Sequence, residues 1–545
     1  MAMPNGRLQL VPFLRIAAMM AMGVWASDAL PLPVWLWLAL AVACLLGVFV
    51  AHRHALAQGA ILLLAFFMTG ACWMQVYVLR HSVALPGEAV TYHAVVVSTP
   101  VSRGQVVQCD LYVLGGPFDG QQVKASFLRP RLQLRVCDGL RVTSVLQPPA
   151  DFSSSSSSSL PSSSSSSVSS HFSYKRWMQT HHFMARTLVL PQHCADTVLS
   201  LRGDSPILRL RVRALQVRAH ILEQLPRWGV RGEAFSVLAA MTLGDKAALD
   251  KDTRQVYAAT GAAHVLALSG MHLSVVATAL MLLFFKKRRG EGRPGLRGRR
   301  AGPLGYVLLL VVVWGYVFLA GCPVSLVRAA AMLSLCSTGV LLGRDAISLN
   351  TLCLTAIILM CANPLCLWDV GFQMSFMAVL AILVFYRPLY HLLVPDVLHR
   401  LAPIRWLCGL LVVSVAAQMG VAPLTLYHFG QFSCCFLLTN VVAVPLVTVM
   451  VPMALCFFLL TLSGPVVQPL LPVVAQCLSW LATLLNTTLA HIAAWPGASL
   501  TGIPFNALMV WLVYMIEAVL FLQGMIFYRA YCCAHSMLPK DLWPV

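Results

Sequence analysis

Charged side chains are scarce in this chain. Asp, Glu, Lys and Arg together make up 10% of the 545 residues, whereas soluble domains carry about 25%. Hydrophobic residues make up 59%, and the mean hydropathy is +0.78. So few charges exclude an ordinary water-soluble protein. The composition predicts a polytopic α-helical membrane protein of about 10–12 spans.

Acidic residues are the scarcest charges. The sequence has 19 Asp and Glu against 38 Lys and Arg, a net charge of +19. Cationic loops orient membrane proteins by the positive-inside rule, which explains part of this excess. The rest favours an anionic partner, either nucleic acid or the lipid bilayer.

Two kinds of motif are missing as well. No Gly-x-x-x-x-Gly-Lys-Ser/Thr phosphate loop occurs, so ATP hydrolysis, if it is needed, is assigned to a cytoplasmic partner. No His-x-His-x-Asp-His metal motif occurs, because "HRH" at His52 to His54 lacks the downstream Asp-His. We therefore predict no metal, no cofactor, no catalytic residue and no enzymatic activity.

The apolar runs divide the chain into membrane and non-membrane parts. Runs long enough to cross a bilayer occupy 1–82 and 236–530, and a short tail, 531–545, follows. The segment from Lys286 to Arg300 carries eight basic residues, which places it in the cytoplasm together with Arg7 and Arg53. The segment that follows residue 82 should therefore begin on the outer side of the membrane.

Residues 85–148 have the pattern of a small β-domain. Short alternating segments such as "QVVQCDLYVL" and "QVKASFL" are separated by Gly, Pro and Asp, and this period-2 pattern predicts a β-barrel of about five strands. Cys109 and Cys137 lie in this domain and could form a disulfide if it faces an oxidising space.

The next two segments differ in character. Residues 149–172 contain a run of serines that cannot form a core and is interpreted as a linker. Residues 173–235 contain "LRLRVRALQVRAHILEQL", with arginines spaced against Leu, Val and Ile. This predicts a cationic amphipathic segment on the membrane surface; a nucleic-acid contact is the alternative.

Polar residues stand at the ends of several apolar runs in 236–530. An ionisable group in hydrocarbon costs at least about 2.5 kcal/mol, so such groups normally face a water-filled cavity or each other. Gly and Pro in the same places suggest broken helices, which are tolerated where they line a cavity or are buried in protein. We predict one aqueous path lined by Asp245, His264, Ser269, Gly270, His272, Arg328, Asp369, Phe372, Gln373, Ser375, Tyr427, His428, Gln431 and Asn440.

These segments resemble a known family. "GDKAALDKDTRQVYAATGAAHVLALSGMHLSVV", "SLVRAAAM", "DVGFQMSFMAVL", "YHFGQFS" and "NVVAVPLV" occur in the order and spacing of the ComEC-type competence proteins. Thr260 to His272 matches that family's Thr-Gly-x-x-His-x-Leu-Ala-x-Ser-Gly-x-His pattern. The resemblance implies a multi-pass channel in the cytoplasmic (inner) membrane of a bacterium that imports single-stranded DNA, with an OB-type barrel on the outer face.

The resemblance also implies how DNA is handled. Arg328 offers positive charge, while aromatic rings offer stacking worth about 1–3 kcal/mol per base. The rings considered are Phe372, Phe376, Tyr427 and Phe429 in the membrane part and Tyr92, Tyr112, Phe118 and Phe127 in the barrel. A purely structural role for the barrel is equally open.

Several partners are expected. The membrane potential opposes import of a polyanion by about 2.3 kcal/mol per charge per 100 mV, so a separate motor or helicase is expected beside a separate DNA receptor. Many family members carry a metallo-β-lactamase-like domain after the last span. Since this chain ends at Val545, the nuclease is expected to be another protein. The sequence leaves monomer and dimer open.

Two other classes of function remain open. A secondary transporter of a small anion or lipid precursor would also use broken helices with polar residues. An intramembrane hydrolase could use Ser269 and His272, whose i, i+3 spacing puts them on one helical face, with Asp369 as an acid approaching in space.

Overall fold

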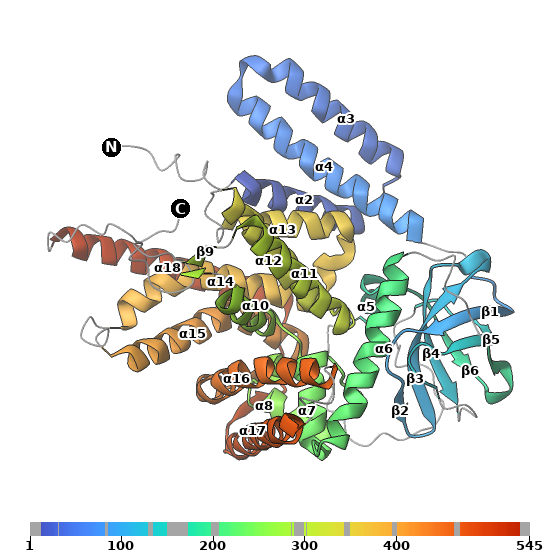
Figure 1. Cartoon of the computed structure of the whole chain (residues 1–545). Coiled ribbons are helices and arrows are strands. Elements are labelled where there is room, and N and C mark those ends of the chain that lie inside the picture. The colour runs from blue at the N-terminus through green and yellow to red at the C-terminus, as the bar shows by residue number, and fades with distance from the viewer. Residues whose placement is uncertain are drawn as a thin grey trace.

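The computed structural model describes residues 12–30, 32–81, 85–128, 134–149, 173–197, 206–284, 286–287, 299–300, 302–342, 349–394, 401–462 and 469–534. Most of these residues form helices, and one larger β-sheet lies beside the helix bundle (Figure 1). The helices and 3₁₀ segments are α2 (Pro12–Ala29), α3 (Val34–Val50), η1 (Ala51–Arg53), α4 (Ala55–His81), η2 (Gly116–Phe118), α5 (Tyr174–Thr180), η3 (Pro191–His193), α6 (Pro206–Arg227), α7 (Gly232–Leu243), α8 (Lys251–Ala259), α9 (Ala263–Leu266), α10 (Gly270–Phe284), α11 (Pro303–Leu319), α12 (Val324–Leu341), α13 (Leu349–Ala362), η6 (Pro364–Trp368), α14 (Val370–Leu393), α15 (Ala402–Phe429), α16 (Phe436–Leu462), α17 (Leu471–Ala493) and α18 (Ala507–Ala534).

The helices confirm the prediction of a polytopic membrane protein. Within the described residues, 8 helices are long and apolar enough to cross a membrane, and shorter apolar helices include α7, α10, α11 and α13. The apolar run from 262 to 284, inside the predicted membrane part 236–530, is not one helix. It divides into α9 and α10, because the chain leaves helical geometry at Ala267, whose backbone is extended.

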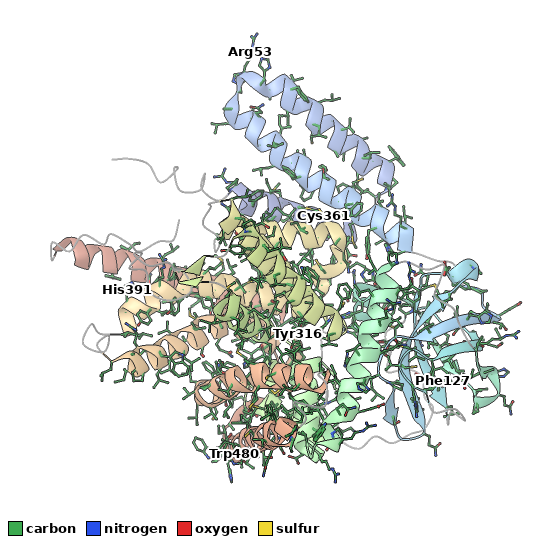
Figure 2. All side chains as sticks on the ribbon, viewed as in Figure 1. Arg53, Phe127, Tyr316, Cys361, His391 and Trp480 are labelled. Atoms are coloured by element: carbon green, nitrogen blue, oxygen red, sulfur yellow. The ribbon has the colours of Figure 1, made fainter. Side chains whose placement is uncertain are left out.

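The first three helices form one end of the bundle. The hairpin of α3 and α4 extends away from the rest and carries Arg53 at its tip (Figures 1 and 2). Helix α2 packs against α4 and α13. A Cβ at Gly70 would lie 2.5 Å from the Met20 carbonyl oxygen, and one at Gly23 would collide with the Phe67 carbonyl. Glycines on both helices thus allow the two backbones to approach closely, as is common between membrane helices.

The β-sheet has seven strands in the order β6-β4-β3-β1-β5-β7, with β2 paired to β3. Its strands are β1 (Ala89–Val96), β2 (Val101–Arg103), β3 (Val106–Leu114), β4 (Gln122–Leu128), β5 (Gly139–Val145), β6 (Phe183–Val189) and β7 (Cys194–Asp196). Only β4 and β6 are paired in parallel. Gln147 and Arg186 exchange backbone hydrogen bonds of 2.9 Å, so the chain after β5 meets β6 and the sheet curls into a barrel.

The sheet extends beyond the predicted range 85–148. Strands β6 and β7 come from the far side of the serine-rich linker, from a stretch that we had grouped with the amphipathic segment 173–235. In β6, Phe183, Ala185, Thr187 and Val189 alternate inward. This period-2 pattern is present in "FMARTLV", but the neighbouring Arg and Lys residues suggested a surface helix instead.

The barrel interior corrects the expectation that its aromatic rings are available to bind DNA. Tyr92, Phe118 and Phe127 are buried in its core, so these rings do not face solvent where a base could stack. Tyr112 packs beside Leu215 of α6. The predicted aromatic DNA-binding surface of the barrel is therefore not formed by these residues.

The predicted Cys109–Cys137 disulfide is absent from the structure. Both thiols are free. Cys109 lies in the barrel core, where burial raises the pKa of its thiol to about 12. Cys137 lies on the side facing α6, and its thiol donates to the Val212 carbonyl at 3.5 Å. Cys109 lies on β3 and Cys137 lies in the turn before β5, and the two side chains pack in different clusters, so they do not meet.

Helix α6 is the predicted amphipathic segment, and it lies between the barrel and the bundle (Figure 1). Its inward residues recur every three or four positions and are Leu208, Val212, Leu215, Arg218, Ile221 and Leu225. Leu215 packs against the sheet, whereas Ile221 and Leu225 belong to the main bundle core. The apolar face of α6 thus joins the two parts of the protein.

A second junction joins α4 to the turn before β6 through His182. Its Nδ1 lies 3.0 Å from the Tyr77 hydroxyl, and its Nε2 lies 3.4 Å from the Asn363 amide nitrogen. The Asn363 side chain also donates to the Thr180 carbonyl and accepts from Leu365 N–H. The amide nitrogen therefore faces His182, whose Nε2 must be an unprotonated acceptor. Protonation of His182 Nε2 would place its N–H donor opposite the N–H donor of the Asn363 amide.

We expect this junction to weaken in acid. Partial removal from water lowers the pKa of His182, and the nearby His81 and His181 lower it further. Because the folded-state pKa is depressed, stability from neutral His182 is full above the ordinary value of 6.5 and is lost as the pH falls below it. The loss should be only a few tenths of a kcal/mol, because the side chain is partly open to solvent.

Hydrogen exchange of β6 and of the end of α4 measures this effect. The matched variant is His182→Asn, since Asn tolerates the left-handed φ of 62° found there. In the wild type, the protection factor, which is the ratio of the intrinsic to the observed exchange rate at each pH, should fall between about pH 7 and pH 5.5, and this fall should be absent in the variant. An equal fall in protection in both proteins would assign the effect to other groups.

Candidate functional site

One large cavity lies where α14, α15, α18 and α5 meet. Its volume is about 1380 Å³. The N-terminal end of α14, the C-terminal end of α15, the segment before and into α18, η6 and α5 contribute to its wall. Five of the residues predicted to line an aqueous path do line this cavity: Asp369, Phe372, Gln373, Tyr427 and His428.

Arg328 of α12 reaches this wall as one member of a buried ion pair. Its Nη1 lies 3.2 Å from Asp369 Oδ2, and its Nη2 donates to the Gly371 carbonyl at 2.7 Å. The two side chains are 3% and 13% exposed. The positive charge that we had assigned to DNA is therefore compensated by Asp369, so Arg328 stabilises the helix arrangement.

Asp369 has a second role as the N-cap of α14. Its Oδ2 accepts the Phe372 backbone N–H at 2.9 Å, which satisfies one of the free donors at the start of a helix. The positive end of the helix dipole also favours a carboxylate at this position. The same side chain thus begins α14 and holds α12 against it.

Gln373 and His428 connect α14 to α15 within the cavity wall. The Gln373 amide nitrogen donates to the Leu367 carbonyl at 2.7 Å, which turns its Oε1 toward His428 Nε2 at 3.0 Å. His428 Nε2 is therefore the protonated nitrogen and donates to Gln373. Ser375 also lies on α14 but is not among the residues that line the cavity.

The polar residues at the start of α10 form a separate cluster. Ser269 Oγ lies 3.0 Å from Nδ1 of His272. His272 is fully buried, and its Nε2 has no hydrogen-bond partner within the described part of the chain. His264 is exposed and contacts the Gly261 carbonyl through Nδ1 at 3.0 Å.

This geometry does not match a catalytic triad. There, one histidine nitrogen faces the nucleophile and the other is oriented by an acid. Here Nδ1 faces Ser269 and Nε2 faces no acid, while Asp369 is occupied by Arg328. Ser269 and His272 instead form a local hydrogen bond at the start of α10.

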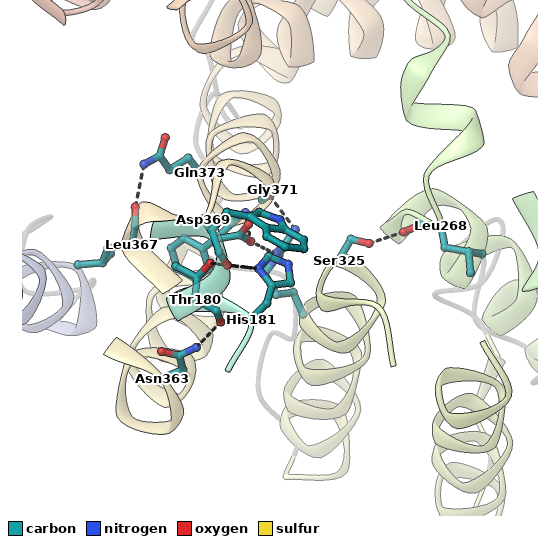
Figure 3. Close-up of polar contacts among 12 residues, drawn as sticks. Thr180, His181, Leu268, Ser325, Asn363, Leu367, Asp369, Gly371 and Gln373 are labelled. Carbon is teal, nitrogen blue, oxygen red and sulfur yellow. Dashed lines mark hydrogen bonds and ion pairs between the residues drawn. The ribbon is translucent and has the colours of Figure 1, made fainter. Parts of the chain in front are cut away.

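Helix α12 links the start of α10 to the cavity wall. The Ser325 hydroxyl donates to the Leu268 carbonyl (Figure 3), and a Cβ at Gly270 would lie 3.4 Å from the Ala329 side chain. One turn from Ser325, Arg328 binds Asp369. The "ALSG" and "DVGF" segments are thus both attached to one short stretch of α12.

The remaining predicted residues lie elsewhere. Asp245 is 3.8 Å from Arg218 and helps to hold α6 against the bundle. Gln431 belongs to β10 (Gln431–Ser433), which pairs with β11 (Ser499–Thr501). The Asn440 side-chain amide donates to Ser414 Oγ at 3.1 Å between α16 and α15.

Sequence reasoning missed the contribution of α5 to the cavity. Arg176 and Trp177 line it. The Arg176 guanidinium lies 2.5 Å from Asp28 and 4.9 Å from the centre of the Trp368 ring. Lys246 also lines the cavity and is exposed. "YKRWMQT" places two consecutive cations directly before a Trp, a signal that could have marked this segment as part of a binding site.

Fold and site together define a class: a multi-pass helical membrane protein with a β-barrel beside the bundle and a cavity lined by aromatic, polar and cationic side chains. The family model described as "Competence protein" matches residues 241–526, more than half of the chain. The chain belongs to this family, as its ComEC-type segments predicted.

Two curated relatives were found. The chain is 27% identical over 285 residues to ComE operon protein 3 of Bacillus subtilis, a match that covers 52% of this chain and 32% of the relative. It is 27% identical over 247 residues to Recombination protein 2 of Haemophilus influenzae, covering 44% and 30%. The chain thus spans about a third of the length of the curated relatives that it matches. No solved structure matches it.

Proposed function

We propose that this protein conducts single-stranded DNA across the cytoplasmic membrane during DNA uptake. The observation that carries the proposal is the cavity of about 1380 Å³ at the ends of α14 and α15, in a chain of the competence family. The cavity combines Trp, Phe and Tyr rings with the exposed cation Lys246 and with Arg176, whose charge is paired with Asp28. Proteins that bind single strands without sequence preference use the same combination.

The cavity offers stacking surfaces that are accessible. Trp25, Phe429 and Trp511 line it and are all exposed. Lys246 adds a cation beside them. Rings held on helices can receive bases of any identity, while the cations attract the phosphates.

In this proposal the barrel lies on the outer face of the membrane and has the OB arrangement. The pairing order supports the second point: β1 pairs with β3 and β5, β4 pairs in parallel with β6, and the chain after β5 meets β6. Since its large aromatic residues are buried, we assign the barrel to positioning α5 at the cavity and α6 against the bundle. Its placement outside follows the positive-inside argument.

In this proposal, a separate protein supplies the energy for import. Each phosphate moving into a negative interior costs about 2.3 kcal/mol per 100 mV. A separate cytoplasmic motor or helicase would pull the strand, a separate receptor would deliver it, and any nuclease would be a further protein.

Uptake of labelled DNA tests the proposal. A strain lacking this gene should bind labelled double-stranded DNA at its surface but accumulate no internal single strands, and the full-length gene should restore accumulation. Ser269→Ala should also restore it, because a channel needs no nucleophile. Normal internalisation without the gene would overturn the channel. Failure of a well-folded Ser269→Ala protein would instead favour hydrolysis at Ser269.

A further inference from the structure

A second cavity lies at the opposite end of the α14–α15 pair. Its volume is about 1010 Å³, and it is lined by the C-terminal end of α14, the N-terminal end of α15 and the middle of α16. His391 marks this end of α14, across the molecule from Phe127 in the barrel (Figure 2). The uptake proposal makes no use of this cavity.

The rim of this second cavity is cationic. Arg387 of α14 and Arg405 of α15 line it together with His391, and none of the described residues that line it is acidic. The sequence between the two helices adds Asp396 but also Arg400, so this part of the chain keeps a net positive charge. Two guanidinium groups suit a phosphate, which arginine binds through paired N–H donors.

The inner wall of the cavity is apolar. Leu410 and Val413 of α15 and Val444 of α16 line it. Gly409 adds space, since a Cβ there would find only the Tyr386 hydroxyl, at 3.7 Å. A cavity with two arginines at its rim and an aliphatic inner wall matches a molecule with a phosphate at one end and a hydrocarbon chain at the other.

The surroundings of the cavity are typical of a membrane interface. Tyr386, Tyr390 and Trp406 line it, and Trp406 is 55% exposed. Leu392, Leu393 and Leu401 are exposed at the adjoining helix ends. Tyr and Trp gather at the headgroup level of bilayers, and basic pockets between membrane helices bind anionic headgroups.

We propose that this second cavity binds an anionic phospholipid. Its phosphate lies between Arg387 and Arg405, and one acyl chain enters the groove between α15 and α16 along Gly409, Val413 and Val444. A nucleic-acid strand fits less well, because the inner wall, as far as the structure describes it, carries no cation for a second phosphate. The proposal does not depend on DNA transport.

Lipid binding by the full chain purified in detergent tests the proposal. Native mass spectrometry and thermal unfolding would compare phosphatidylglycerol with zwitterionic phosphatidylcholine, inorganic phosphate and an oligothymidylate. Phosphatidylglycerol should bind most tightly. The double variant Arg387→Gln/Arg405→Gln should weaken it about tenfold. Arg53→Gln, an exposed cation at the tip of the α3–α4 hairpin, is the control and should leave it unchanged.

A steric variant separates the lipid from a free phosphate. Gly409→Leu places a side chain in the acyl groove and keeps both arginines, so it should weaken phosphatidylglycerol about fivefold without affecting inorganic phosphate. Three results would overturn the proposal. Phosphatidylcholine could bind as tightly as phosphatidylglycerol, or inorganic phosphate could stabilise the protein as much as phosphatidylglycerol does. The third such result is that binding of the oligothymidylate requires Arg387 and Arg405 whereas binding of phosphatidylglycerol does not. Loss of DNA uptake with lipid binding intact would concern only the transport function.

Discussion

Arg328→Met is expected to destabilise the folded chain by about 3–5 kcal/mol, because it leaves a buried carboxylate without its partner. Asp369 is only 13% exposed and depends on Arg328 for charge compensation. The variant also removes the hydrogen bond from Arg328 to the Gly371 carbonyl. Helices α12 and α14 would then lose their polar attachment beside the cavity.

A double-mutant cycle measures the pair itself. Asp369→Asn keeps a side chain that can cap α14 but leaves Arg328 charged and unpaired, so it should also be strongly destabilising. The double variant Arg328→Met/Asp369→Asn should recover most of the loss. Thermal unfolding in detergent and the amount of protein in the membrane are the measurements.

The control for this prediction is Arg213→Met on α6. Arg213 is exposed, and surface changes of this kind usually lie within about 0.5 kcal/mol. If Arg328→Met were as stable as this control and had lost only DNA uptake, Arg328 would be a DNA contact and the structural role argued above would be wrong.

The sequence predicted local features better than contacts between distant segments. Long apolar runs identified the membrane helices because burial in lipid imposes a composition on about 20 residues at once. The i, i+3 spacing of Ser269 and His272 correctly indicated that their side chains meet. Arg328 and Asp369 are 41 residues apart, and no periodicity relates them. Only the packing of α12 on α14 reveals that these two charges compensate each other.

The barrel shows a second limit of sequence reasoning. Alternation predicted strands β1, β3, β4 and β5 but not the short β2, and it does not say which strand completes the sheet. Strand β6 is separated from β5 by the serine-rich linker. Its closing contacts with Gln147 are backbone hydrogen bonds that any sequence could make. The Thr187 hydroxyl adds a bond to the Val145 carbonyl, but a lone threonine does not mark a closing strand. Alternation likewise identified Tyr92 and Phe127 as aromatic residues on strands without revealing that they fill the interior.

The second prediction with a large expected effect concerns the exposed aromatic rings of the cavity of about 1380 Å³. Phe429→Ala combined with Trp511→Ala should reduce internalised single-stranded DNA by roughly 10- to 100-fold, because each stacked base is worth about 1–3 kcal/mol. Phe429 is 61% exposed and Trp511 69% exposed, so the loss of stability should be small. DNA bound at the cell surface should be unchanged, since the proposal assigns its capture to a receptor.

A matched pair of aromatic residues outside the cavity provides the control. Phe527 on α18 is 74% exposed and Trp480 on α17, labelled in Figure 2, is 64% exposed, and neither lines the cavity. Phe527→Ala combined with Trp480→Ala removes the same ring types from comparably exposed helix surfaces, so uptake should stay near the wild-type level. An equal loss in both double variants would mean that aromatic residues act through membrane anchoring. A loss confined to Phe429 and Trp511 would place the strand in the cavity, because these two rings line the same cavity as the exposed Lys246.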